Sequence, residues 1–152
     1  MKNICIGLFG TCDNIRWRDP FMKIFDERGV VYFNPMVDDW NESFIPIEAR
    51  HLAEDEIILF PILKDSYGLG SLAEVAFGPL KDIIANKNRT YIFLIDDDVT
   101  EALQADKAMA KASKRTRALV KGHLKDLGLK NLHLVSSLEE MLDLTLKVYD
   151  NA

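Results

Sequence analysis

The sequence contains little cysteine, and no apolar run in it is long enough to span a membrane. Its two cysteines, Cys5 and Cys12, lie close together in a chain of 152 residues, so they do not suggest a disulfide framework. We expect both to be reduced thiols in a cytoplasmic protein. Apolar stretches stay below the ~18 residues of a membrane span, and Met1-Lys2-Asn3 leads directly into a strand-like run rather than into a signal peptide. We therefore expect neither a membrane partner nor export.

Basic side chains are also fewer than acidic ones. The chain carries 19 basic and 24 acidic side chains, with a net charge of −5 and a pI near 5.2, which argues against nucleic acid and leaves small molecules or other proteins as partners. The charge is uneven, because residues 107–125, here called the basic segment, hold seven basic residues and no acidic one. We interpret the basic segment as a helix that faces solvent or another subunit. If it folded over a ligand site, Lys114, Arg115 and Arg117 would supply affinity for phosphate.

Apolar residues make up 48% of the chain and gather in short runs between segments with helical spacing. A length near 150 residues is typical of one domain, so we expect a single domain over residues 1–152. Runs rich in β-branched or aromatic residues are predicted as strands: Ile4 to Phe9, Val30 to Phe33, Ile57 to Leu63, Tyr91 to Ile95 and Leu132 to Val135. The predicted helices cover Trp17 to Arg28, Ile45 to Glu54, Ser71 to Ala85, about Thr100 to Leu127, and Leu138 to Tyr149.

This alternation predicts a parallel sheet with helices on both faces. Strands that are apolar on both sides and separated by helices are typical of a doubly wound α/β fold, here of the flavodoxin-like type with five strands in the order 2-1-3-4-5. In such a sheet, ligands bind beyond the carboxyl ends of the strands where the strand order reverses, between the first and third strands. We therefore expect the chemistry in the loops 10–16, 34–43 and 64–70.

The third of these loops runs through two glycines into a predicted helix, and two interpretations compete. In one, Ser71 caps the helix and Glu74, three residues on, bonds back to the backbone in a capping box. In the other, Gly68 and Gly70 let the backbone approach a small molecule at the start of the helix. The position of the loop at the predicted reversal point favours the second interpretation.

Glu74 could also form a pair with Glu48, which lies on the predicted helix before the third strand. A helical carboxylate at that position is otherwise a solvated surface residue. Two carboxylates roughly 5 Å apart can cleave a glycosidic bond, with one attacking the anomeric carbon and the other handling protons or ordering the nucleophile. The sequence alone does not set their separation.

Three stretches of the chain together resemble a known family. They are Gly10-Thr11-Cys12 followed by Trp17-Arg18-Asp19, then Tyr32-Phe33-Asn34-Pro35-Met36-Val37-Asp38-Asp39-Trp40, and last Gly68-Leu69-Gly70-Ser71-Leu72-Ala73-Glu74. The pattern is similar to the nucleoside 2-deoxyribosyltransferase family, in particular to its short bacterial and phage-type branch. The resemblance runs roughly from residue 4 to residue 95 and is most specific in the block from Phe33 to Trp40.

The resemblance implies the doubly wound fold and the exchange of nucleobases on 2-deoxyribose, with retention at C1′, as a step of nucleotide salvage. It implies that Glu74 is the nucleophile, that Glu48 helps to hold it, and that Asp39 or Asp65 gives a proton to the departing base. It surrounds the sugar and base with Phe9, Gly10, Thr11, Trp17, Asn34, Pro35, Asp38, Trp40, Asp65, Tyr67, Gly68, Gly70 and Ser71. It implies no metal or organic cofactor, a deoxynucleoside and a free nucleobase as small-molecule partners, and a homo-oligomer.

Other functions stay open from the sequence. A hydrolase of deoxynucleosides or of their 5′-phosphates would use the same carboxylates, and a nucleotide-binding or signalling member of the fold group would use only the crevice. Cys12 and Arg18 have the Cys-x5-Arg spacing of a phosphatase loop. The intervening residues lack glycine and include Asp13, which disfavours that function.

Two patterns that resemble metal sites have simpler explanations. The triplet Asp96-Asp97-Asp98 follows the fourth predicted strand, and acidic residues at the start of a helix stabilise its dipole, so we expect Asp98 or Thr100 to cap the next helix. The histidines are scattered without ligand spacing, so we expect no zinc site. They are His51, His123 and His133.

Overall fold

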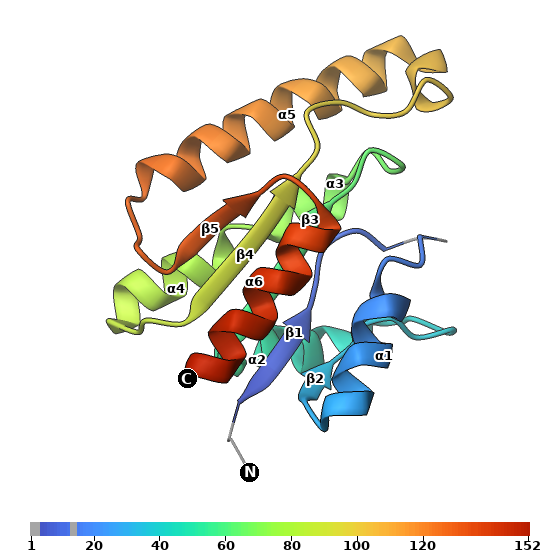
Figure 1. Ribbon diagram of the computed structural model, residues 1–152. Helices are drawn as coiled ribbons and strands as arrows, with labels where there is room; N and C mark the ends of the chain where they lie inside the picture. Colours follow the sequence, from blue (N-terminus) through green and yellow to red (C-terminus); the bar gives the residue numbers. More distant parts are fainter. Residues whose placement is uncertain (1–3, 13–14) are drawn as a thin grey trace.

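The computed structural model describes residues 4–12 and 15–152, and these residues form a five-stranded parallel sheet (Figure 1). The strand order is β2-β1-β3-β4-β5, so the predicted doubly wound α/β fold is confirmed. Each strand lies within, or one residue from, the predicted run. The strands are β1 (Cys5–Leu8), β2 (Val31–Phe33), β3 (Ile57–Ile62), β4 (Thr90–Ile95) and β5 (Leu132–Val135).

Helices cover both faces of the sheet (Figure 1). On one face lie α1 (Arg18–Arg28) and α6 (Leu138–Asn151). On the other lie α2 (Ile45–Glu54), α3 (Leu69–Glu74), α4 (Phe77–Ala85) and α5 (Lys107–Asp126). Short 3-10 turns, η1 (Glu42–Phe44) and η2 (Leu103–Ala105), precede α2 and α5. Among the described residues, no helix is long and apolar enough to cross a membrane.

The predicted helix 71–85 is two helices in the structure, because the chain makes a turn at 75–76 between α3 and α4. α3 begins at Leu69, and its N-cap is Gly68, which has a φ of 67°. Ser71 therefore lies inside α3, and the predicted capping box is wrong. The reason is Gly68, since a positive φ costs glycine little and turns the chain into the helix before Ser71 is reached.

The long helix after β4 starts later than predicted. α5 begins at Lys107 rather than near Thr100, and Asp106 caps it by accepting a hydrogen bond at 3.0 Å from a backbone N–H of its first turn. The predicted cap at Asp98 or Thr100 is wrong, because neither residue is the N-cap of η2 or α5. The Asp98 carboxylate instead forms an ion pair with Lys114 of α5 at 2.6 Å.

Two apolar layers, one on each face of the sheet, form the core. Along β3 every residue is buried and the side chains alternate, so that Ile57 and Leu59 join the layer under α1 and α6 while Ile58 and Phe60 join the opposite layer. β1 pairs with β3 in parallel, yet the helices that follow these two strands lie on opposite faces. The strand order therefore reverses between β1 and β3, as predicted, and the loops after β1, β2 and β3 gather at that edge.

Candidate functional site

A cavity of about 190 Å³ lies at this edge of the sheet. Its walls come from the segment after β1, from the loop between β2 and α2, and from the helices α2 and α3. The lining residues are Phe9, Gly10, Cys12, Pro35, Met36, Val37, Trp40, Glu48 and Glu74. The structure thus brings Glu48 and Glu74, which are distant in sequence, to one cavity with an aromatic and apolar wall.

The two carboxylates of the cavity have unequal surroundings. Glu48 lies in the first turn of α2, and Glu74 is the last residue of α3. The pKa of the Glu74 carboxyl is raised, mainly by partial removal from water and further by the negative charge of Glu48. Glu48 accepts a hydrogen bond at 2.8 Å from the indole Nε1 of Trp40. Glu48 is therefore oriented by an indole, and the Glu74 carboxylate is more basic than an ordinary glutamate.

The floor of the cavity depends on tight packing at Gly10. This residue has a φ of +89°, and a Cβ there would collide with the carbonyl oxygen of Pro61 in β3. Only glycine allows this approach without a backbone shift. Phe9 packs beside it against Phe33 and Phe60, with ring centroids 5.8 and 6.2 Å away. The floor is therefore apolar and close to the sheet.

Arg18, which is 3% exposed, holds the loop after β1. Its guanidinium donates hydrogen bonds to the backbone oxygens of Leu8, Phe9 and Thr11 at 2.8, 3.2 and 2.9 Å. The indole of Trp17 also donates to the Thr11 oxygen, at 2.9 Å. Because the guanidinium is occupied by carbonyl groups of the chain itself, the geometry disfavours a phosphatase loop, in which the arginine must face a phosphate.

Arg117 of α5 holds the loop after β3 in the same way. It is 0% exposed, and its guanidinium donates to the backbone oxygens of Ile62 and Asp96 at 2.9 and 3.1 Å, and to those of Leu63 and Ser66 at 3.0 and 2.6 Å. The interpretation of the basic segment as a solvated helix is therefore wrong at this residue. A guanidinium engaged in this way is not available to a phosphate group.

The acidic triplet Asp96-Asp97-Asp98 faces other members of the basic segment. Asp97 forms an ion pair with Lys121 at 2.5 Å, and Asp98 forms the pair with Lys114 described above. Hydrogen bonds from these two lysines lower the pKa of both aspartates. The ion pairs of Asp97 and Asp98 thus link the end of β4 to α5.

Several residues that the sequence suggested for the site lie outside the cavity wall. These are Thr11, Trp17, Asn34, Asp38, Asp39, Asp65, Tyr67, Gly68, Gly70 and Ser71. Asp39 and Asp65 are exposed, so they could meet only a ligand that extends beyond the cavity. Tyr67 faces η2, where its hydroxyl donates to the backbone oxygen of Leu103 at 2.7 Å.

Three lining residues were missed by the sequence reasoning. They are Cys12, Met36 and Val37. Met36 and Val37 are apolar residues inside a polar loop that follows a strand, and this contrast was the available signal. Cys12, which borders the cavity next to Gly10, stood out in the sequence only through the stretch Gly10-Thr11-Cys12 and the Cys-x5-Arg spacing.

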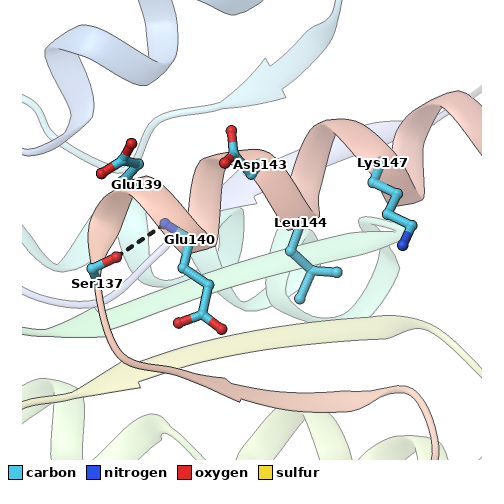
Figure 2. A pocket seen from close by; sticks show the side chains of 6 residues that line it. All are labelled: Ser137, Glu139, Glu140, Asp143, Leu144 and Lys147. Atoms are coloured by element: carbon cyan, nitrogen blue, oxygen red, sulfur yellow. Dashed lines mark hydrogen bonds between the residues drawn. The ribbon is translucent and has the colours of Figure 1, made fainter.

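Larger depressions exist elsewhere, but size alone does not mark a site. One of about 460 Å³ is lined entirely by α6 and its cap, through Ser137, Glu139, Glu140, Asp143, Leu144 and Lys147. Figure 2 shows Glu139 and Asp143 pointing away from Glu140, on the other side of the helix. Acidic side chains that diverge along one helix provide no common space for a reaction.

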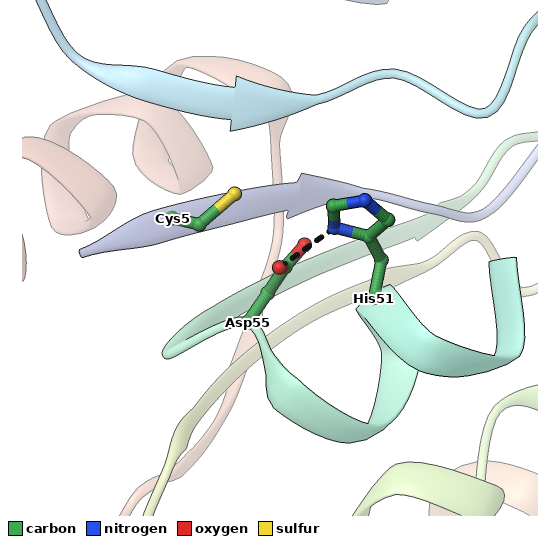
Figure 3. Close-up of side chains that lie close together, drawn as sticks. All are labelled: Cys5, His51 and Asp55. Atoms are coloured by element: carbon green, nitrogen blue, oxygen red, sulfur yellow. Dashed lines mark hydrogen bonds and ion pairs between the residues drawn. The ribbon is translucent and has the colours of Figure 1, made fainter. Parts of the chain in front are cut away.

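One group of side chains outside the cavity could hold a metal ion. Cys5, His51 and Asp55 each offer one ligand atom, and these atoms lie within 4.8 Å of one another (Figure 3). Spacing among the histidines gives no sign of this group, because its third member, Cys5, comes from β1 and is distant in sequence.

The chain matches no family model and no curated protein.

Proposed function

We propose that the protein transfers 2-deoxyribose between nucleobases through a covalent deoxyribosyl-glutamate, in line with the resemblance described above. The observation that carries the proposal is the pair of Glu48 and Glu74 on one cavity. Two carboxylates are the groups that glycosidic bond exchange requires, one as nucleophile and one in support. The aromatic and apolar wall suits a nucleobase and a sugar ring, and the reaction belongs to the cytoplasm.

In the first half of the reaction, the Glu74 carboxylate attacks C1′ of the deoxynucleoside from the face opposite the base. A C1′–O bond forms as the C1′–N bond breaks, and the electron pair of the broken bond leaves with the base, which takes up a proton from solvent. The raised pKa of Glu74 makes its ionised form more basic and a better nucleophile. Glu48 adds negative charge that stabilises the oxocarbenium-like transition state.

In the second half, a different base attacks C1′ from the face that the first base has left. A new C1′–N bond forms as the attacking nitrogen gives up its proton to solvent, the C1′–O bond breaks, and its electron pair returns to the Glu74 carboxylate. Two inversions give retention at C1′. Water in place of the second base would give hydrolysis, and Trp40, a lining residue that is 55% exposed, leaves room for water. Hydrolysis is therefore the second candidate function.

The charge of the wall favours an uncharged substrate. Within the described part of the chain, the charged residues that line the cavity are Glu48 and Glu74, both acidic. A 5′-phosphate beside them would be repelled. We therefore propose deoxynucleosides, rather than their 5′-phosphates, as substrates.

The cavity is small for a whole nucleoside, and this supports a homo-oligomer. Ligand pockets commonly measure about 300–1,000 Å³, whereas this cavity has about 190 Å³. In the proposal, a second copy of the chain completes the wall. Neighbouring helices α2 and α4 expose the apolar side chains that such a contact would bury, namely Ile45, Ile47, Phe77, Leu80, Ile83 and Ile84.

A base-exchange assay tests the proposal. The protein is incubated with 2′-deoxyinosine and adenine, and in parallel with 2′-deoxyuridine and cytosine, and the products are separated by chromatography. Transfer produces a new deoxynucleoside, whereas hydrolysis releases only base and deoxyribose. A protein that merely binds nucleotides would give neither product, and this result would contradict the proposal.

The variant Glu74→Gln is expected to lower kcat for base exchange by at least about 1000-fold, because an amide cannot displace the base. Mass spectrometry of the wild-type protein, incubated briefly with a deoxynucleoside alone, should detect a deoxyribosyl adduct that the variant lacks. Glu54→Gln, at the exposed end of α2, is the matched control and should keep full activity. A folded Glu74→Gln protein that exchanged bases at the wild-type rate would rule out the covalent mechanism.

A further inference from the structure

A second cluster of reactive side chains lies at the end of β1 opposite the cavity. Cys5 is the first residue of β1, His51 lies in the last turn of α2, and Asp55 follows that helix directly. Figure 3 shows the thiol, the imidazole and the carboxylate close together between the strand and the helix. We propose that Cys5, His51 and Asp55 bind one Zn²⁺ ion, with water in the fourth position.

The spacing of the three donors is close to what zinc requires. His51 and Asp55 are four residues apart, so they lie on one side of the helix, and Nδ1 of His51 is 2.9 Å from Oδ1 of Asp55. All three ligand atoms lie within 4.8 Å of one another. A tetrahedral zinc ion with bonds of about 2.0–2.3 Å holds its ligand atoms roughly 3.3–3.7 Å apart. Side-chain rotations that move these atoms by about 1 Å are therefore sufficient.

One oxygen of the Asp55 carboxylate is buried without a hydrogen-bond partner among the described residues. The Asp55 side chain is 4% exposed, and the oxygen concerned is Oδ2. A buried carboxylate oxygen without a partner is costly, and a cation would remove that cost. Gly7 of β1 makes room for this oxygen, because a Cβ there would lie 2.9 Å from it.

The cluster is suited to a metal rather than to nucleophilic catalysis. A half-buried thiol beside a carboxylate, as Cys5 is beside Asp55, is a poor nucleophile. A divalent ion reverses this situation, because it offsets the carboxylate charge and displaces the thiol proton. Thiolate and imidazole together favour Zn²⁺ over Mg²⁺ or Ca²⁺.

The imidazole is already oriented. The ring of His51 stacks on Phe33 with a centroid distance of 3.7 Å and an interplanar angle of 2°, while Nδ1 faces Asp55. His51 and Cys5 are partly exposed, so an ion and its water can reach the site. Bound zinc would hold the end of α2 against β1. The ligand His51 lies about one helical turn after Glu48. The site does not depend on the function proposed for the cavity.

Cobalt titration of the metal-free protein tests the site. Co²⁺ replaces zinc in tetrahedral sites and reports a bound thiolate by a charge-transfer absorption in the near ultraviolet. We expect this absorption to saturate at one equivalent of Co²⁺, to disappear when Zn²⁺ is added, and to weaken as the pH falls, since protons compete for the ligands. Wild-type protein that shows no charge-transfer absorption, and whose melting temperature Zn²⁺ does not raise, would overturn the proposal.

Matched variants identify the ligands. Cys5→Ser should abolish the charge-transfer absorption and weaken Zn²⁺ binding more than about 100-fold, whereas Cys12→Ser, which removes the other cysteine of the chain, should leave both unchanged. His51→Gln provides a second test in case Cys5→Ser does not fold, as judged by circular dichroism, and it should also weaken binding. Absorption that survives in Cys5→Ser but is lost in Cys12→Ser would overturn the assignment.

Discussion

The loops after β1 and β2 line the cavity, and the loop after β3 leads to α3, whose Glu74 also lines it; the three loops are held in different ways. A buried arginine donates to backbone oxygens in two of them, Arg18 after β1 and Arg117 after β3. The loop after β2 is held by contacts at the surface, through the indole of Trp40 on Glu48. Trp40 is 55% exposed, whereas both arginines are exposed by 3% or less.

This difference separates a fixed floor from an adjustable wall. Buried hydrogen bonds from a charged donor are strong, and breaking them leaves carbonyl groups without partners, so the loops that carry Gly10 and lead to Glu74 keep their shape. Contacts between exposed side chains contribute little, so Trp40 can shift when a ligand enters. A fixed floor beside an adjustable wall suits the proposed reaction, in which two different bases occupy the same site in turn.

The largest expected effect is the loss of stability in the variant Arg117→Met, which removes the donor that holds the loop after β3. The variant leaves the backbone oxygens of Ile62 and Leu63 buried without their donor, and the free energy of unfolding should fall by about 3–5 kcal/mol. Urea denaturation followed by circular dichroism measures the change. Arg115→Met, on the exposed side of the same helix, is the control and should change stability by less than about 0.5 kcal/mol. Equal losses at the two positions would show that the floor does not depend on Arg117.

Substitutions at the two tryptophans test the difference between the fixed floor and the adjustable wall. Trp17 is 3% exposed, so Trp17→Ala should lower the free energy of unfolding by about 3–5 kcal/mol. Trp40→Ala should lower it by less than about 1 kcal/mol but raise KM for the deoxynucleoside about 10-fold, because an aromatic surface of the wall is lost. Thermal or urea unfolding and steady-state kinetics measure the two effects. Similar stability losses in both variants would remove the distinction.

The smallest expected effect is a shift of the pH profile in Glu48→Gln. The nucleophile acts as a carboxylate, so kcat/KM should fall as the pH falls through the pKa of Glu74. The negative charge of Glu48 contributes to raising that pKa; its removal lowers the pKa, and the acid limb of the profile moves to lower pH. Gln keeps an oxygen for the Trp40 indole. Glu54→Gln should leave the limb in place, and a shift to higher pH in Glu48→Gln would contradict the coupling.

Much of the fold was predictable because it depends on local pattern. The apolar runs and the helical spacing between them indicated every strand, and α2 was predicted from Ile45 to Glu54 as observed. The position of the cavity followed from strand order, which places the ends of β1 and β3 together. The pairing of Glu48 with Glu74 was suggested by residue type, but their presence on one cavity required the structure.

Other features escaped prediction because they depend on contacts between distant parts of the chain. Arg117 belongs to a segment that is basic throughout, and nothing local distinguishes it from the exposed Arg115. Only the carbonyl groups at the ends of β3 and β4 make it a buried residue. Ser71 had the local pattern of a helix cap, but Gly68 turned the chain into α3 earlier.

The amino-acid pattern was therefore sufficient for the α/β architecture, the strand order and the edge of the sheet where the cavity lies, because hydrophobic periodicity and chain connectivity are read along the chain. The folded chain was needed to show which charges are buried, which loop is held only by exposed contacts, and that Cys5 meets His51 and Asp55. Burial and the meeting of side chains are set by what packs against each residue, and those neighbours are distant in sequence.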